Sequence, residues 1–238
     1  MPFFYAMDPL YLLCFGAALV LSLLAQGWVK SSFARYSQVP NLRRLSGAEA
    51  AHAMLVSANI TGVRINRYSG GWLSDHYNPA DQTINLSPGI YDGRSVAAVG
   101  IACHEAGHAI QHAQGYGLLT LRNWVVPTAN IGSALGVPLI IIGMLMGSLG
   151  LAKIGLGLFS LVFVFQLITL PVELDASSRS KAALINGGIV AHGVETEGVS
   201  RVLTAAAMTY VAAAVGTLLT ILYYAYRLGL LGGRSRND

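Results

Sequence analysis

The chain has 238 residues, of which 54% are hydrophobic and only 11% carry a charge. Soluble domains carry roughly 25% charged residues, so this composition excludes an ordinary soluble protein and favours a chain embedded in a bilayer. The formal net charge of +4 suits contact with anionic lipid, and no basic run interleaved with aromatic residues predicts nucleic-acid binding.

Four stretches are long and apolar enough to cross a hydrocarbon core, which takes about 20 helical residues. They cover residues 9–29, 124–149, 151–172 and 202–226. In the first of them, Asp8 and Pro9 predict the helix start, and Trp28 with Lys30 predicts an end at the membrane interface. Only the turn at 147–150 separates the second stretch from the third, which predicts a tight transmembrane hairpin.

The segment between the first and second stretches predicts a small α+β domain outside the membrane. Ser46 and Glu49 form a capping-box pattern that opens a helix. Alternating apolar and polar residues at 63–87 predict a hairpin or small sheet, and 95–114 predicts a helix. The expected fold is therefore a mainly α membrane protein with about four transmembrane helices and a small α+β extramembrane domain.

The predicted organisation follows these elements along the chain. It comprises a transmembrane helix (1–30), the α+β extramembrane domain (31–123), a transmembrane hairpin (124–172), a polar segment (173–201), and a C-terminal transmembrane helix with its tail (202–238).

An HExxH motif lies in the helix predicted at 95–114. His104 and His108 are four residues apart, so both imidazoles lie on one helix face and can reach a single metal ion. Glu105 lies on the adjacent face, where a carboxylate can take a proton without being a ligand. Zinc accepts imidazole and carboxylate, and its catalytic sites use three protein ligands, so we expect one Zn²⁺ and a third ligand elsewhere in the chain.

Two acidic residues at the end of the third apolar stretch are the candidates for that ligand. Glu173 and Asp175 are the first acidic residues after the motif, and on a continuing helix they point in nearly opposite directions. We prefer Glu173 as the ligand because its arm is longer, and we expect Asp175 to orient one of the histidines. The alternative is that both only solvate the helix end and pair with Arg179 or Lys181.

Three other histidines complete the candidate set. His76 and His192 could each polarise a substrate carbonyl, although a surface histidine without this role fits the same positions. His112 lies two turns after His104, but a fourth protein ligand would close the site to water, so we do not assign it to the metal.

Five runs of sequence resemble the YugP-type neutral zinc metallopeptidases of bacterial membranes. They are GWLSDHYNP at 71–79, LSP at 86–88, SVAAVGIACHEAGHAIQ at 95–111, PVELDAS at 171–177 and LTAAAMTYVAAA at 203–214. The resemblance implies a gluzincin-type endopeptidase, distantly like the HtpX and CAAX-protease membrane enzymes. It implies that His104 and His108 bind zinc and that Glu105 is the base, although those enzymes space their later acidic residues more widely than Glu173 and Asp175.

The expected function is a membrane-integrated zinc endopeptidase that acts on proteins or peptides. Two alternatives stay open: an intramembrane-cleaving zinc protease with Asp175 as ligand, and a non-catalytic metal-binding scaffold or regulator. The substrate chain is expected to lie extended along the segment between Trp72 and Leu86.

We expect a multi-pass protein of the cell membrane with its active site on the cytoplasmic side. By the positive-inside rule this side carries Lys30, Arg35, Arg43, Arg44, Arg122, Arg179, Lys181 and Arg201. Three basic residues of the tail favour the opposite orientation: Arg227, Arg234 and Arg236.

Overall fold

The structure is a computed structural model that describes residues 8–71 and 74–231. Trp72, Arg234 and Arg236 lie outside the described residues. The chain divides into two compact units, each built from segments distant in sequence. Unit 1 comprises Met1–Ala25, Leu121–Leu170 and Thr209–Asp238, and unit 2 comprises Gln26–Thr120 and Pro171–Met208.

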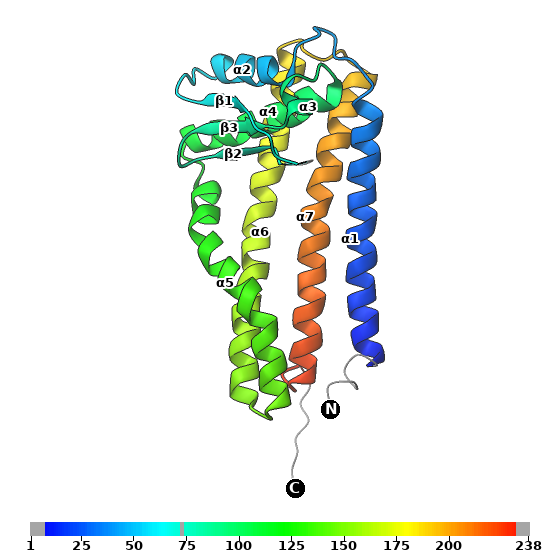
Figure 1. Ribbon diagram of the computed structural model, residues 1–238, viewed down its shortest axis with the longest axis vertical. Coiled ribbons are helices and arrows are strands. Elements are labelled where there is room, and N and C mark those ends of the chain that lie inside the picture. Colours follow the sequence, from blue (N-terminus) through cyan, green and yellow to red (C-terminus); the bar gives the residue numbers. More distant parts are fainter. Residues whose placement is uncertain (1–7, 72–73, 232–238) are drawn as a thin grey trace. The chain divides into compact units, whose positions relative to one another are not determined.

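Four long helices account for most of the chain (Figure 1). Each contains a window with a mean hydropathy between 1.8 and 2.1, which is apolar enough to cross a membrane. They are α1 (Pro9–Tyr36), α5 (Gly117–Leu145), α6 (Leu149–Asn186) and α7 (Val194–Arg227). The protein is thus a mainly α membrane protein, which confirms the predicted fold class.

All four of these helices extend beyond the predicted limits, and α5 and α7 do so at their starts, Gly117 and Val194. Helix α1 does not end at the Trp28–Lys30 interface but continues to Tyr36, because no glycine or proline interrupts residues 28–36. Its last turns contribute Phe33 and Tyr36 to the hydrophobic core of unit 2. Helix α6 likewise runs through Pro171 to Asn186, so the first half of the predicted polar segment is helical.

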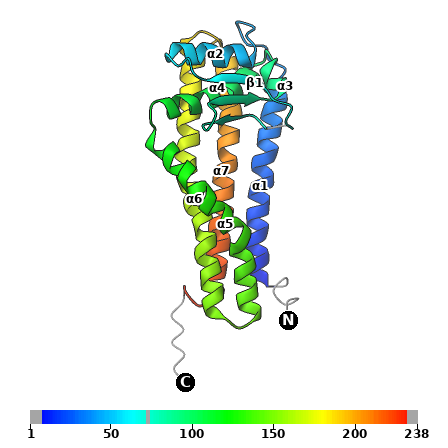
Figure 2. The same ribbon diagram turned by 60° about the vertical axis from the view of Figure 1, so that its left-hand side comes forward.

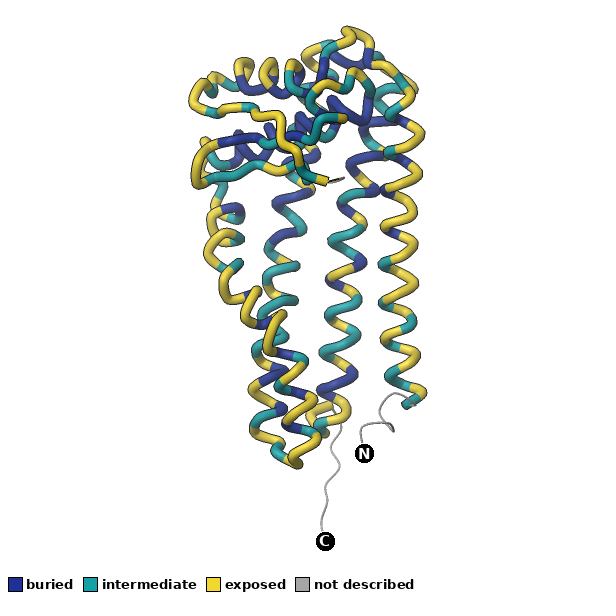
Figure 3. Tube along the Cα trace, viewed as in Figure 1, coloured by how far each residue is buried: buried dark blue, intermediate teal, exposed yellow. Residues whose placement is uncertain are grey.

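Unit 1 has the packing expected of helices in lipid. Large apolar side chains such as Leu13, Leu24 and Ile154 are exposed, where lipid takes the place of water (Figure 3). The end of α5 and the start of α6, which the turn at Gly147 joins, lie side by side in both views (Figures 1 and 2). A Cβ added to Gly143 would lie 2.4 Å from the backbone nitrogen of Ala152, so only glycine permits this approach.

Unit 2 contains the predicted α+β elements. Helix α2 (Gly47–Ser57) begins with the expected capping box: the Glu49 N–H donates to Ser46 Oγ, and the Ser46 N–H donates to Glu49 Oε2. The sheet has the order β1-β3-β2, with β1 (Arg64–Arg67) parallel and β2 (His76–Asn78) antiparallel to β3 (Thr83–Leu86). The short helix α3 (Pro88–Tyr91) follows β3.

Helix α4 (Val96–Ala113) is the centre of unit 2. It contacts α2, α3, β2 and β3, and most of its residues are buried. This environment explains its composition of alanine, valine and glycine, since small side chains let several elements pack around one helix. The HExxH motif therefore lies inside a packed core, as Figure 3 shows for the α4 region.

Candidate metal centre

Helix α4 contributes two histidines and α6 one carboxylate to a compact cluster. His104 Nε2 lies 3.1 Å and His108 Nε2 lies 3.6 Å from Glu173 Oε2. The three potential ligand atoms all lie within 4.8 Å of one another. Zinc bonds of about 2.0–2.2 Å in a tetrahedron place ligand atoms about 3.3–3.6 Å apart. The spacing and the His₂Glu donor set therefore fit one Zn²⁺.

Gly107 lets α6 approach α4 closely enough to form this cluster. A Cβ at Gly107 would lie 2.8 Å from the carbonyl oxygen of Ala176, a backbone atom that cannot rotate away. Ala176 is three residues after Glu173, so the contact lies one helical turn from the carboxylate. The glycine inside the motif thus has a packing role in addition to the chemistry of its neighbours.

Replacement of Gly107 by alanine should destabilise the protein. Overpacking costs about 1–3 kcal/mol, which exceeds the gain of up to about 1 kcal/mol from replacing a helical glycine. The control is Gly100→Ala in the same buried helix, where the new Cβ would meet only a Val199 methyl at 3.7 Å. Thermal unfolding in detergent should show a lower Tm for G107A alone, and equal Tm values for the two variants would contradict this packing role.

Gln111 determines which nitrogen of His108 carries the proton. Its side chain is fully buried, and its amide group donates to the Val172 carbonyl at 2.9 Å and to Asp175 Oδ2 at 2.7 Å. These two acceptors occupy both amide hydrogens, so the amide oxygen faces His108 Nδ1 at 2.9 Å and accepts its N–H. The lone pair of His108 is thereby left on Nε2, which faces Glu173.

His104 has a comparable partner. The Ser177 hydroxyl oxygen lies 3.2 Å from His104 Nδ1, and when Nδ1–H donates to this oxygen the lone pair of His104 lies on Nε2, on the Glu173 side. Ser177 is one turn after Glu173 on α6. The same helix therefore provides the carboxylate and the group that orients a histidine.

Glu105 lies beside the cluster without contributing to it. The side chain is buried, and its Oε2 accepts the backbone N–H of Tyr77 at 2.9 Å. Burial raises the pKa of Glu105 above its ordinary value, the charges of Glu173 and Asp75 raise it further, and His104 and His108 oppose the rise. A raised pKa makes this carboxylate a stronger proton acceptor than an ordinary glutamate.

The pKa of His108 is shifted by opposing effects. Burial lowers it, but the hydrogen bond with Glu173 and the negative charges of Glu105 and Glu173 outweigh burial, so the pKa lies above its ordinary value. A proton held by His108 would have to leave before a cation binds, so metal binding at this cluster is coupled to proton release.

The remaining predicted site residues lie apart from the cluster of ligand atoms. Asp175 contacts Gln111 and Arg179, so it reaches His108 only through the glutamine. His76 is exposed, with Nδ1 near the Ser74 carbonyl and Nε2 near Asn85. His192 lies in the exposed turn before α7. His112 Nδ1 is 2.7 Å from the Tyr77 hydroxyl.

Three residues at the site were not identified from the sequence: Tyr77, Gln111 and Ser177. Gln111 follows His108 by three residues on the same helix, a spacing that could have indicated a side-chain contact. Ser177 follows Glu173 by four residues in the same way. The Tyr77 backbone N–H has no signature in the side-chain pattern.

Comparison with known proteins gave two matches and one negative result. The family described as "Putative neutral zinc metallopeptidase" matches residues 11–229. A Bacillus subtilis (strain 168) protein named "Putative membrane protease YugP" is 43% identical over 221 residues, which cover 93% of this chain and 96% of that protein. No solved structure matched the chain.

Proposed function

Because the chain belongs to the neutral zinc metallopeptidase family, we propose that it is a membrane-integrated endopeptidase in which His104, His108 and Glu173 hold one zinc ion. The observation that carries the proposal is the cluster of two imidazoles and one carboxylate with a buried, non-ligating glutamate beside it. A zinc ion bound there supplies a Lewis acid that activates water and polarises a peptide carbonyl.

The role of Glu105 follows from its position. As an ionised carboxylate it accepts the proton of the attacking water, and it then delivers that proton to the nitrogen of the cleaved peptide bond. The Tyr77 N–H fixes one carboxylate oxygen, which leaves the other oxygen as the proton acceptor. Gln111 and Ser177 hold the two histidines in the tautomer that presents Nε2 to the cation.

The substrate of the proposed reaction is a polypeptide segment in an extended conformation. Among the described residues, β2 pairs only with β3, so the other edge of β2 can receive a further strand. Tyr77 in β2 contacts Glu105 directly, and an extended peptide on this edge would therefore pass beside the proposed base. His76 precedes Tyr77 on the same strand, where it can contact that peptide.

The cytoplasmic placement of the active site is supported by the distribution of positive charge. Unit 2 contains the cluster and 10 of the 15 lysine and arginine residues of the chain. The positive-inside rule assigns such a segment to the cytoplasm. Lipid and a cytoplasmic or membrane-bound polypeptide are thus the proposed partners.

The two alternative functions are less consistent with the site. A metal-binding scaffold does not need Glu105, and a buried carboxylate that binds no cation lowers stability. A protease with Asp175 as ligand requires that side chain beside the histidines, whereas its Oδ2 accepts hydrogen bonds from Gln111 and Arg179.

Removal of the metal tests the proposed function. Protein purified in detergent should contain one zinc per chain and cleave an unfolded protein substrate. Chelation should abolish cleavage by removing the Lewis acid, and stoichiometric Zn²⁺ should restore it. Elemental analysis and gel electrophoresis of the substrate provide the two measurements. Undiminished cleavage by the metal-free protein would refute a zinc-dependent mechanism.

A further inference from the structure

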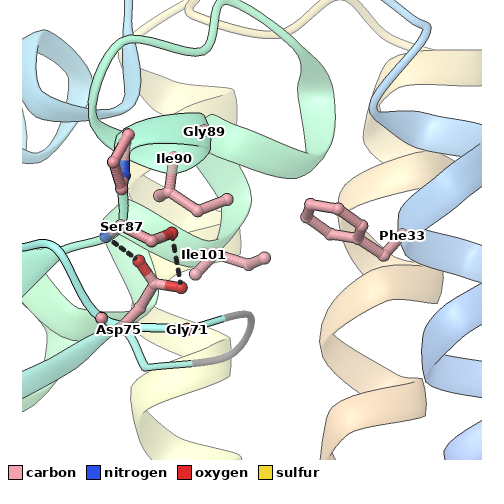
Figure 4. Close-up of a pocket in the computed structure, with 9 residues that line it drawn as sticks. Phe33, Gly71, Asp75, Ser87, Gly89, Ile90 and Ile101 are labelled. Carbon is pink, nitrogen blue, oxygen red and sulfur yellow. Dashed lines mark hydrogen bonds between the residues drawn. The ribbon is translucent and has the colours of Figure 1, made fainter.

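Besides the candidate metal centre, unit 2 has a pocket of about 290 Å³. Figure 4 shows Phe33 of α1 facing Ile90 of α3 and Ile101 of α4 across this space. The backbones of Gly70, Gly71 and Gly89 line the rest of its wall, together with Pro88 and the Asp75–Ser87 pair. Ligand pockets have volumes of about 300–1,000 Å³, so this one suits a single side chain better than a whole small molecule.

The pocket is connected to the candidate metal centre by two elements. Ile101 precedes His104 by three residues and Glu105 by four, so these side chains are neighbours on the surface of α4. Asp75 precedes Tyr77 by two residues, and the Tyr77 N–H is bonded to Glu105. A substrate peptide bound beside Glu105 can therefore place one of its own neighbouring side chains in the pocket.

The chemistry of the lining favours an apolar occupant. Phe33, Ile90 and Ile101 present only carbon atoms. Both oxygens of the single carboxylate, Asp75, already accept hydrogen bonds from Ser87, with Oδ1 2.7 Å from the backbone nitrogen and Oδ2 3.3 Å from Oγ (Figure 4). This pair ties the segment before β2 to the start of α3 and shapes the pocket wall.

We infer that this pocket receives a large apolar side chain of the substrate, such as leucine or phenylalanine, at a position next to the cleaved bond. The inference rests on the proposed endopeptidase function and adds a preference of that endopeptidase for apolar residues next to the cleaved bond. Phe33 and Ile101 lie on facing walls of the pocket, and Gly89 adds no side chain to its lining.

Gly89→Leu is the direct test because it adds a bulky apolar side chain to the wall of the pocket. A Cβ at Gly89 would meet no atom within 4 Å, and its backbone is outside the left-handed region. The probes are peptides that differ only at one of the three positions on either side of the cut, where they carry Ala, Leu, Phe, Trp, Lys or Asp. Wild type should cleave the Leu or Phe peptide with a kcat/KM at least about 10-fold above that of the Ala peptide.

In G89L this preference should disappear, while the zinc content stays at the wild-type level. The matched control is Gly117→Leu at an equally open glycine outside the pocket, which should keep the wild-type preference. Phe33→Ala, which widens the pocket, should raise cleavage of peptides that carry tryptophan relative to leucine. This second variant tests the pocket if G89L does not fold.

The outcomes separate the two proposals. If zinc-loaded wild type cleaves none of the peptides and no unfolded protein, the endopeptidase proposal and the pocket inference both fail. If wild type cleaves them without an apolar preference, or prefers Lys or Asp, only the pocket inference fails. An apolar preference that persists in both G89L and F33A would also assign the selectivity to another part of the protein.

Discussion

Replacement of Glu105 by glutamine should reduce kcat/KM for peptide hydrolysis by about 100- to 10,000-fold and leave the zinc content unchanged. Glutamine has nearly the shape of glutamate, and its oxygen can still accept the Tyr77 N–H. Its amide cannot take a proton from water, so only the proton transfer is lost. Because Glu105 is buried, a neutral side chain at this position should not lower the Tm.

A matched control distinguishes this loss from a general effect of removing a negative charge. Glu197→Gln changes an exposed residue whose carboxylate pairs with Arg201 at 2.7 Å on α7. Its kcat/KM and zinc content should both equal those of wild type. Activity of E105Q above about a tenth of the wild-type value would remove Glu105 from the mechanism.

Glu173→Ala should weaken zinc binding by more than about 100-fold, whereas Asp175→Ala should weaken it by about 10- to 100-fold. The first variant removes an oxygen that lies between the two imidazoles. The second removes only the acceptor that helps to position Gln111, and groups that act through a ligand typically contribute within that smaller range.

Competition with a chromogenic chelator gives both affinities, and the wild type is the reference. Which of the two variants binds zinc more weakly is the decisive result, more than either affinity alone. If D175A lost zinc and E173A retained it, Asp175 would be the ligand. Helix α6 would then have to be turned about its own axis relative to the orientation described above. If both retained it at wild-type affinity, the three-residue cluster would not be the zinc site.

Local patterns in the sequence were sufficient to predict much of this site. The four-residue spacing of His104 and His108 fixes their common face within one helix, independently of the rest of the fold. Capping residues and apolar periodicity likewise predicted α2, α4 and the four long helices. Helix geometry indicated that Glu173 and Asp175 could not both face the metal, and the longer side chain favoured Glu173, which the structure places beside both histidines.

The features that were missed depend on contacts between elements. Gln111 is recognisable as important only once the Val172 carbonyl and Asp175 on α6 are known to meet it. The Tyr77 N–H reaches Glu105 because β2 packs on α4, and a backbone group leaves no trace in composition. The extension of α1 to Tyr36 is stabilised by the core of unit 2, which a helix-end signal at Lys30 does not include.

If the proposed zinc site is correct, the close approach of α4 and α6 at Gly107 would let the cation stabilise the fold as well as take part in catalysis. His104 and Glu173 are 69 residues apart, so a bound metal closes a loop that contains all of α5 and the first part of α6. A metal that only the folded chain binds stabilises the folded chain in proportion to the logarithm of the free zinc concentration. The amount of intact enzyme in the membrane would then follow the zinc supply of the cell, because chains without metal unfold more readily and are exposed to degradation.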